Sequence, residues 1–523
     1  MLERIHLKVE SGEFVLLCGA SGRGKTTLLR QIKKELAPVG FRSGEVLFQG
    51  KPLSSYDDRY LARNIGMVQQ SPENQTVTDR VLSELVFPME NVGFESGLMR
   101  RRAAELSHYF GLDSLLGKQV HELSGGQKQL VQLASVLALQ PKPLLLDEPT
   151  AQLDPLAARE LIQPLERINH DLGLTIIVAE HRYEESLPVV DRVVAMENGS
   201  IRHIGTPREV LRAFWSDKSG GWSDFVPPIP KLFLQSQGNK SEELPLTVKE
   251  ARRQLRRLAS SEPPEVLMPG AADPADVKPV LLECRDLIFQ YTAADARPVL
   301  RNASLRVHAG EVLAILGANG SGKTTPLKAM AGILKPQKGK ILLQGKELGK
   351  WKPHERSAQI GYLHQNPLTY FIEETVELEP RQAAARGRHI GAEAAKETAD
   401  IVDLLGLAHV LDRHPYDLSE GERQLAALAA VLMTSPMLLL LDEPTKGLDA
   451  SAKRRWGERS RELQGMGQTV VMVTHDVEFA AAYATRCAMM FDGMLAAGGA
   501  PEPFFRDNLY YTTAMSQLMR GDL

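Results

Sequence analysis

Residues 19–26 read Gly-Ala-Ser-Gly-Arg-Gly-Lys-Thr, and residues 317–324 read Gly-Ala-Asn-Gly-Ser-Gly-Lys-Thr. Each octet follows an apolar run, FVLLC or EVLAIL, and precedes a helical pattern. Both fit the strand–loop–helix pattern G-x-x-x-x-G-K-[ST], in which glycines let backbone N–H groups surround phosphate oxygens. The lysine neutralises the outer phosphates, and the hydroxyl after it binds Mg²⁺. The sequence therefore predicts two nucleotide-binding units.

The predicted nucleotide ligands in these loops are glycines, small polar residues, lysines and threonines. In the first loop they are Gly19, Ser21, Gly22, Gly24, Lys25, Thr26 and Thr27. In the second loop they are Gly317, Asn319, Gly320, Gly322, Lys323, Thr324 and Thr325. One such loop in a chain of this length could arise by chance, but two in the same context make a pair of ordinary glycine turns a poor explanation.

Acidic pairs follow two apolar strands further along the chain. PLLLDEPT places Asp147 and Glu148 at a strand end, and MLLLLDEPT places Asp442 and Glu443 likewise. The aspartate can hold the Mg²⁺ shell, and the glutamate can polarise an attacking water. Carboxylates can also simply solvate a strand end, but the upstream loops favour the catalytic interpretation. A histidine ends a later strand in each half, namely His181 and His475.

The two halves repeat one another at an almost constant spacing. The offsets are 298 for Lys323 − Lys25, 295 for Leu418 − Leu123, 295 for Asp442 − Asp147 and 294 for His475 − His181. Such regularity indicates an internal duplication.

Composition sets broad limits on the class of protein. The 523 residues are too many for one core, and 43% hydrophobic with 24% charged residues is a globular balance. A net charge of −3 argues against a general nucleic-acid binder. The three cysteines, Cys18, Cys284 and Cys487, are scattered, which indicates a reducing, cytosolic setting. The start of the chain has no apolar leader pattern, so no signal peptide is expected.

One apolar run, Leu425–Leu441, approaches the length of a membrane span. Thr434-Ser435-Pro436 interrupts it, so we expect a buried helix, a turn and a buried strand. Any membrane role should then come through a partner.

With these motifs in place, the sequence resembles the ATP-binding-cassette (ABC) ATPases over nearly its whole length, twice. LSGGQ (123–127) and LSEGE (418–422) match the family's signature motif. Gln70 and Gln365 match its Q-loop glutamine, and Asp154 and Asp449 match its D-loop. His181 and His475 match its switch histidine. The resemblance implies ATP and Mg²⁺ as cofactors.

The resemblance also assigns site residues. The catalytic set is Glu148, Glu443, His181, His475, Gln70 and Gln365. The Mg²⁺ set is Thr26, Asp147 and Gln70 in the first half, and Thr324, Asp442 and Gln365 in the second. In this family the two cassettes pair head to tail, so each ATP meets the signature of the other half. The signature residues that would meet phosphate are Ser124, Gly126, Ser419 and Gly421.

The implied fold is α/β: two P-loop ABC ATPase domains, each a mainly parallel sheet with helices, an antiparallel part and a helical subdomain. We expect domains at 1–211 and 279–523, joined by a linker at 212–278 rich in Pro, Gly and Ser. One amphipathic helix should interrupt the linker, with Val248, Ala251, Leu255 and Leu258 on its apolar face. Its arginines could meet lipid headgroups, although a solvated face is the simpler interpretation.

The two halves depart from the family pattern in different places. Tyr291 matches the aromatic that stacks on adenine, whereas the first half lacks the strand and aromatic that should precede its loop. Glu420 and Glu422 replace the usual glycine and glutamine of the signature. We expect Glu422 to point into solvent and Glu420 to slow closure around phosphate. The resulting hypothesis is a functionally asymmetric ATPase, in which the site of Glu443 supplies most of the turnover.

Among tandem cassettes, the pattern around Gln70 and Gln75 and the ending RDNLYYTTAMSQLMRG resemble the energy-coupling-factor importers of vitamins or metal ions. That resemblance implies a transmembrane coupling subunit, a membrane-embedded substrate-binding subunit and a place at the cytoplasmic face of the cell membrane. Tandem sugar-importer ATPases are one alternative, but they tend to carry a damaged P-loop. Soluble translation or repair ATPases are another, but the near-neutral linker and the lack of a long coiled coil disfavour them. A nucleotide sensor should have lost its catalytic glutamates.

Overall fold

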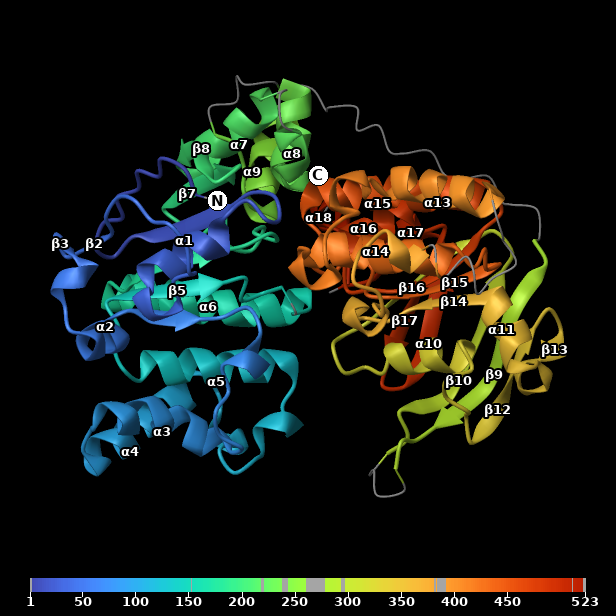
Figure 1. The fold of residues 1–523 in the computed structure, drawn as a ribbon, viewed down its shortest axis with the longest axis horizontal. Helices are drawn as coiled ribbons and strands as arrows, with labels where there is room; N and C mark the ends of the chain where they lie inside the picture. Colours follow the sequence, from blue (N-terminus) through green and yellow to red (C-terminus); the bar gives the residue numbers. More distant parts are fainter. Residues whose placement is uncertain are drawn as a thin grey trace. The chain divides into compact units, whose positions relative to one another are not determined.

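The computed structural model describes residues 2–151, 153–217, 221–237, 243–259, 278–292, 297–380, 382, 392–509 and 511–520 (Figure 1). The chain divides into two compact units, Met1–Thr247 and Val248–Leu523. Across these described ranges, no helix is long and apolar enough to span a bilayer.

A six-stranded sheet forms the centre of the first unit, in the order β4-β5-β6-β1-β7-β8. The strands are β1 (Phe14–Cys18), β4 (Gly66–Val68), β5 (Pro143–Asp147), β6 (Thr175–Ala179), β7 (Arg192–Glu197) and β8 (Ser200–Gly205). Neighbouring strands are parallel except for the last pair, β7 and β8. Every residue of β1 is buried, as expected for a central parallel strand covered on both faces.

Helices cover this sheet and build a separate helical region. They are α1 (Lys25–Ile32), α2 (Asp58–Asn64), α3 (Val81–Val92), α4 (Ser96–Tyr109), α5 (Gly125–Leu137), α6 (Pro155–Leu172), α7 (Pro207–Ser216) and α8 (Pro228–Gln237). Helix α3 packs against α4 and α5, and these three helices lie together below the sheet in Figure 1. They correspond to the predicted helical subdomain.

The second unit repeats the same sheet in the order β14-β15-β16-β11-β17-β18. Its strands are β11 (Val312–Leu316), β14 (Ile360–Leu363), β15 (Leu438–Asp442), β16 (Thr469–Val473), β17 (Arg486–Phe491) and β18 (Met494–Gly499). Again only the last pair is antiparallel. Helix α14 (Glu420–Leu432) and strand β15 confirm the helix–turn–strand prediction for Leu425–Leu441.

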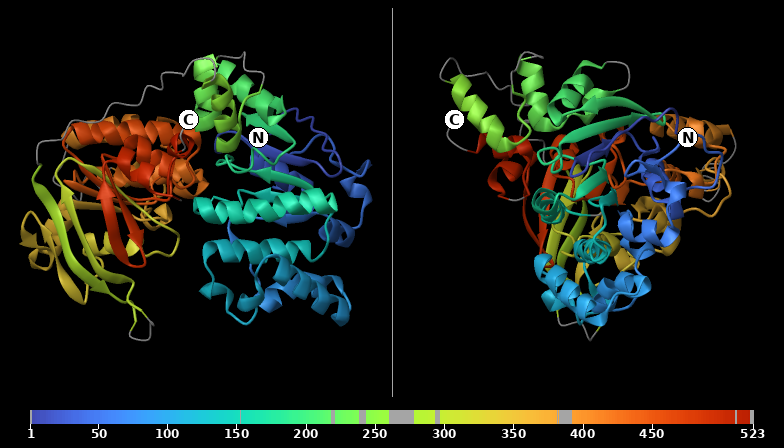
Figure 2. Two further views of the ribbon diagram at one scale, coloured as in Figure 1. Left: turned by 180° about the vertical axis from the view of Figure 1, so that it is seen from behind. Right: turned by 90° about the vertical axis from the view of Figure 1, so that its left-hand side faces the viewer.

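An antiparallel sheet, β10-β9-β12-β13, flanks this core, with two of its strands before β11 in the chain and two after it (Figures 1 and 2). Its strands are β9 (Val280–Phe289), β10 (Leu300–His308), β12 (Lys338–Leu343) and β13 (Lys346–Glu347). In the first unit the described counterpart is a hairpin of β2 (Leu47–Phe48) and β3 (Lys51–Pro52). The start of the chain keeps the equivalent register, because Glu3 N–H donates to Gly199 O as Arg301 N–H donates to Gly493 O, over 2.9 and 2.8 Å.

The second unit also contains eight further described α-helices. They are α9 (Val248–Ala259), α10 (Thr324–Met330), α11 (Pro353–Gln359), α13 (Ala392–Leu405), α15 (Ala450–Gly465), α16 (Val477–Tyr483), α17 (Pro501–Asp507) and α18 (Ala514–Met519). Helix α9 packs on α18, with Ala251 fully buried and Arg252 donating to backbone carbonyls of Gln517 and Arg520. The side chain of Leu258, predicted on the apolar face, lies outside the described residues.

The segment after Arg212 differs from the connector with a single helix that its Pro, Gly and Ser content suggested. Helix α7 runs on to Ser216, a 3-10 turn covers Trp222–Phe225, and α8 follows. Trp222 stacks on Phe214 with ring centroids 4.7 Å apart, and both side chains are buried. Burial of these aromatic rings fixes the segment to the first unit, which turn-forming residues alone do not reveal. Residues 260–277 of the predicted linker lie outside the described residues.

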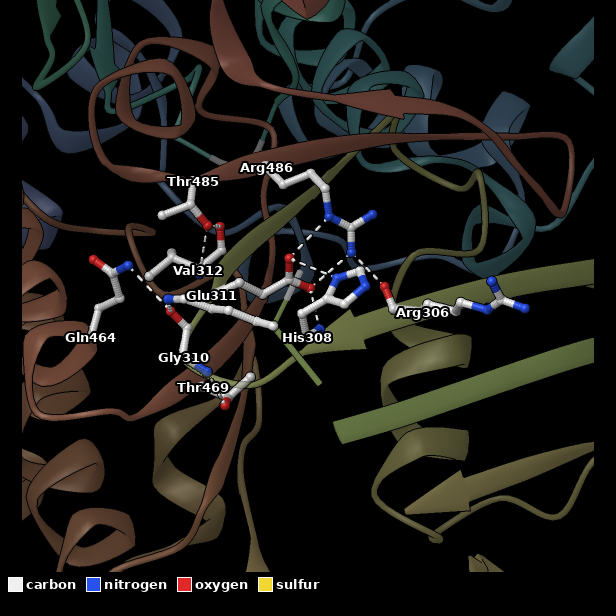
Figure 3. Close-up of polar contacts among 10 residues, drawn as sticks. Arg306, His308, Gly310, Glu311, Val312, Gln464, Thr469, Thr485 and Arg486 are labelled. Atoms are coloured by element: carbon white, nitrogen blue, oxygen red, sulfur yellow. Dashed lines mark hydrogen bonds and ion pairs between the residues drawn. The ribbon is translucent and has the colours of Figure 1, made fainter. Parts of the chain in front are cut away.

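A polar cluster joins three strands where β11 begins (Figure 3). Glu311 lies at its centre and accepts the His308 N–H over 2.8 Å and the Arg486 Nε and Nη2 groups over 3.0 and 2.8 Å. Arg486 also donates to the Arg306 carbonyl. The cluster ties β10, β11 and β17 together at the edge opposite the phosphate loop, which leaves the carboxyl ends of the strands for the functional site.

Candidate functional site

The first loop follows β1 and ends in Lys25, the first residue of α1. Lys25 is 4% exposed, and its Nζ donates to Gly19 O over 2.9 Å and to Ala20 O over 3.1 Å. Gly19 has φ +133°, and a Cβ there would lie 2.4 Å from the Met196 carbonyl oxygen. Only glycine fits at that point. The loop therefore curls around its own lysine, in the arrangement that phosphate binding needs.

The second loop has the same geometry around Lys323, whose Nζ lies 2.9 Å from both Gly317 O and Ala318 O. Within this loop, the Ser321 hydroxyl is a buried polar atom with no hydrogen-bond partner among the described residues. A buried unpaired hydroxyl is costly, and a phosphate oxygen would satisfy it. The first loop has Arg23 at this position, bonded to Asn198. The residues present therefore fit a nucleotide phosphate.

A hydroxyl and a carboxylate lie together beside each loop. Thr26 Oγ1 donates to Asp147 Oδ1 over 2.8 Å, and Thr324 Oγ1 donates to Asp442 Oδ1 over 3.0 Å. Burial raises the pKa of both aspartates above its ordinary value. Hard oxygen donors of this kind suit Mg²⁺, whose charge would favour the ionised carboxylates.

Glu148 is held at the carboxyl end of β5 by two side chains. His181 Nε2 lies 2.7 Å from its Oε1, and Gln70 Nε2 donates to its Oε2 over 2.9 Å. Burial works to raise the pKa of Glu148, but the hydrogen bond and charge of His181, with the charge of Lys25, lower it overall. The carboxylate therefore stays ionised and can accept a proton from water.

Glu443 repeats this pair in the second unit. His475 Nδ1 lies 2.8 Å from its Oε2, and the His475 N–H donates to the same oxygen over 3.4 Å. Against burial, the charge of His475, its hydrogen bonds and Lys323 lower the pKa of Glu443. Gln365, the predicted Q-loop glutamine of this unit, is exposed, whereas Gln70 is bonded to its glutamate. The two units thus bring the same residues together with different Q-loop contacts.

Gln75 and Tyr370 close the two Q-loops in the same way. Gln75 Oε1 accepts the Gln69 N–H over 3.0 Å, and its Nε2 donates to Met67 O over 2.9 Å. Tyr370 accepts the His364 N–H over 3.2 Å and donates to the Tyr362 carbonyl. The residue that suggested the importer type in the sequence therefore shapes the loop next to the predicted catalytic glutamine.

The signature residues lie at the starts of α5 and α14. Ser124 and Gln127 form a capping box, and Ser419 and Glu422 form the same box. In the second box the carboxylate also accepts the Ser419 hydroxyl over 2.7 Å and lies 3.1 Å from His409 Nε2. Glu422 is thus part of the helix cap, whereas the sequence suggested that it points into solvent.

Glu420 extends over Gly447 of its own unit. A Cβ built on Gly447 would lie 2.6 Å from Glu420 Cγ. The matching glycines of the two signatures are packed alike, because a Cβ on Gly421 would lie 3.1 Å from Leu448 Cδ2 and one on Gly126 would lie 3.7 Å from Leu153 Cδ2. Gly125, the counterpart of Glu420, has open space around it. The side chain of Glu420 is therefore accommodated by the absence of a side chain at residue 447.

Tyr291 follows β9 and is 54% exposed, with its hydroxyl 3.3 Å from Thr325 Oγ1. Its ring meets Phe289 edge-on with centroids 4.9 Å apart. The exposed ring lies beside the second loop, where a base could stack on it, which is the role that the family resemblance implies for Tyr291.

Two polar residues near these sites were not predicted from the sequence. Tyr362 directs its hydroxyl at Asp442 Oδ2 over 3.5 Å, where the first unit has the buried Met67. Glu180 is buried directly before His181, where the second unit has Thr474. Comparing the two copies position by position, beyond the named motifs, would have indicated both.

Comparison with known proteins agrees with this geometry. The family model described as ABC transporter matches residues 2–151 and 300–446. A protein of Bacillus thuringiensis subsp. konkukian, provisionally named an ABC transporter ATP-binding protein, is 44% identical over all of this chain and 93% of its own length.

Two solved structures resemble parts or all of the fold. One is cbiO1 from Clostridium perfringens, described as part of the ABC transporter complex cbiONQ. It is 29% identical over 44% of this chain and 91% of its own, with TM-score 0.41. An archaeal ribosome recycling factor, aABCE1, is 21% identical over 95% of this chain and 88% of its own, with TM-score 0.60, and shares the fold. The family model and the Bacillus relative show that the chain belongs to the ABC transporter family of ATP-binding proteins and is an ATPase with two ABC domains in tandem.

Proposed function

We propose that each unit hydrolyses ATP with its own glutamate as general base, Glu148 in the first and Glu443 in the second. The observation that carries this proposal is the pairing of each ionised glutamate with its switch histidine, over 2.7 and 2.8 Å. Each histidine orients its carboxylate toward the phosphate loop, and the carboxylate takes a proton from the attacking water.

The remaining roles follow from the loop geometry. Lys25 and Lys323 bind the outer phosphates, and the loop N–H groups surround them. Mg²⁺, when bound, neutralises the charge that develops on the phosphate oxygens. Thr26 and Asp147, or Thr324 and Asp442, would hold it, with a Q-loop glutamine from the same unit. Ser124 and Ser419 complete the sites if the two units pair head to tail, as the family resemblance suggests.

We further propose that this hydrolysis powers an energy-coupling-factor importer of a vitamin or metal ion. Separate membrane subunits, one for coupling and one for substrate binding, would place the chain at the cytoplasmic face of the membrane. The support is the Gln75 pattern, together with the way Gln75 fixes the loop that carries Gln70. Both phosphate loops keep their lysine contacts, which disfavours a sugar-type tandem ATPase with one damaged loop.

Purification from the native host tests the transport proposal. Tagged chain should retain two kinds of integral membrane protein after solubilisation in mild detergent, one large coupling subunit and one small binding subunit. The complex reconstituted in liposomes should take up a vitamin or a divalent metal ion when ATP is supplied on the chain's side.

The matched control is the Glu148→Gln/Glu443→Gln double variant, which should assemble with the same subunits but drive no uptake. Sugar uptake would support the sugar-type alternative. Co-purification with ribosomes and no membrane protein would support a soluble translation ATPase instead.

A further inference from the structure

A buried acid, Glu180, stands directly before His181 in the first unit, with 1% of its surface exposed. Thr150, two residues after Glu148, donates its backbone N–H to Glu180 Oε1 over 2.9 Å and its hydroxyl to the same oxygen over 2.8 Å. A carboxyl group is costly to bury, and two donors from one residue are a specific compensation. The pair therefore links the chain that follows Glu148 to the chain that precedes His181.

These bonds belong to a closed ring of covalent bonds and hydrogen bonds that lies beside the catalytic pair. The Glu148 N–H donates to Ala179 O over 2.9 Å, immediately before Glu180. Thr150 and Glu180 then complete the ring on the other side. The ring contains Glu148 and adjoins His181, so it fixes the separation of the two segments that carry the 2.7 Å pair.

The backbone conformation of Glu148 indicates what this ring stabilises. Glu148 has φ +47°, a left-handed conformation that a residue with a Cβ keeps only where its surroundings hold it. Its side chain reaches His181 from that conformation. If the chain after Glu148 were released, the carboxylate would leave the position in which it meets the histidine.

The second unit holds the same position by other means. Thr474 replaces the acid, and its hydroxyl lies 3.5 Å from Thr445 Oγ1, at the outer limit of a hydrogen bond. There the His475 N–H itself bonds to the Glu443 carboxylate over 3.4 Å. Dependence on a buried acid is therefore a property of the first unit.

We propose that Glu180 is a positioning residue: acting through Thr150, it holds Glu148 and His181 in the arrangement that ATP hydrolysis in the first unit requires. This inference rests on the roles proposed above for Glu148 and His181. Lys25 and Thr26, which would bind phosphate and Mg²⁺, belong to the loop and α1 and not to this ring. Loss of Glu180 should therefore lower kcat and leave KM for ATP nearly unchanged.

Histidine-selective NMR on the full chain tests the inference directly, with His181 and His475 assigned by single substitutions. In Glu180→Ala the His181 ring resonance should move, while His475 stays in place as the internal control. Glu180→Gln keeps an oxygen for Thr150 and should leave both resonances unchanged. An unmoved His181 in Glu180→Ala, equal shifts in the alanine and glutamine variants, or a joint shift of both histidines would each overturn the proposal.

Kinetics in a Glu443→Gln background give the second readout. There, Glu180→Ala should lower the remaining kcat at least tenfold with KM within twofold, and Glu180→Gln should restore kcat. Thr150→Val keeps the backbone donor, so its kcat should lie between those of Glu180→Ala and Glu180→Gln. If Glu148→Gln does not lower activity in that background, the role proposed for Glu148 is wrong. If Glu148→Gln abolishes activity while Glu180→Ala leaves kcat intact, only the positioning role fails.

Discussion

The carboxyl group of Glu180 should make the stability of the first unit depend on pH. Burial, aided by the charge of Glu148 and opposed by the bonds from Thr150, raises the pKa of Glu180 from 4.5 to about 8. The folded chain then holds this proton more tightly than the unfolded chain. The stabilisation is fully present below pH 4.5 and is lost as the pH rises toward 8.

Glu180→Gln should remove this dependence, because the amide does not titrate. We expect the Tm of the variant minus that of the wild type to grow between pH 4.5 and 8 and to stay constant above 8. Calorimetry at fixed ionic strength measures it, with Thr474→Val as a control that shows no such trend. A difference that is the same at every pH would contradict the raised pKa.

Gly447 should tolerate a side chain only if Glu420 is shortened. Gly447 has φ +70°, and an added Cβ would lie 2.6 Å from Glu420 Cγ. The left-handed conformation alone costs a residue with a Cβ roughly 1–2 kcal/mol, and the clash adds to it.

Gly447→Ala should therefore lower the unfolding free energy by more than about 1 kcal/mol in urea titrations. Adding Glu420→Gly should recover part of that loss. Equal stability of the single and double variants would mean that the two side chains do not compete for this space.

At the scale of elements, the Glu311 cluster holds the antiparallel and parallel sheets of the second unit together (Figure 3). Removing its carboxylate takes away the acceptor of the Arg486 Nε–H and of the His308 N–H and leaves Arg486 with only the Arg306 carbonyl among the described residues. We expect Glu311→Ala to destabilise the second unit by about 1–3 kcal/mol, measured by chemical denaturation.

An exposed ion pair on α15 provides the matched control. Arg454 and Glu458 lie one helical turn apart with about half of each side chain exposed. Glu458→Ala should change stability by no more than about 0.5 kcal/mol. A comparable loss in both variants would show that β10, β11 and β17 do not depend on Glu311.

For the whole molecule, the two catalytic sets should contribute unequally. They differ in the Q-loop contact to the glutamate and in the residue before the switch histidine. We expect Glu443→Gln to reduce steady-state ATPase activity much more than Glu148→Gln. Assays of the ATPase rate of the assembled complex with each single variant test this expectation. Equal losses of activity would refute the hypothesis of a functionally asymmetric ATPase.

The acidic signature provides a separate test of that asymmetry. If Glu420 slows closure around phosphate, Glu420→Gly should raise the ATPase rate. Its place over Gly447 offers a purely structural alternative, in which the rate does not rise and only stability changes. Measuring both quantities on the same variant distinguishes the two.

The sequence by itself determined the features that depend on residues close together in the chain. The loops around Lys25 and Lys323 need glycines at fixed short spacings, and the capping boxes join residues three apart. Alternating buried strands and helices between such landmarks predict a P-loop ATPase fold twice over, which the structure and the family match confirm.

Only the tertiary structure decided the contacts that depend on strand order and loop closure. Thr150 and Glu180 are 30 residues apart, and they meet because β5 and β6 are neighbours in the sheet. Glu420 reaches Gly447 across a helix, a turn and a strand. The aromatic residues that attach 222–225 to the first unit likewise lie in a segment whose composition suggested a connector. Such pairings follow from three-dimensional packing, which no local pattern encodes.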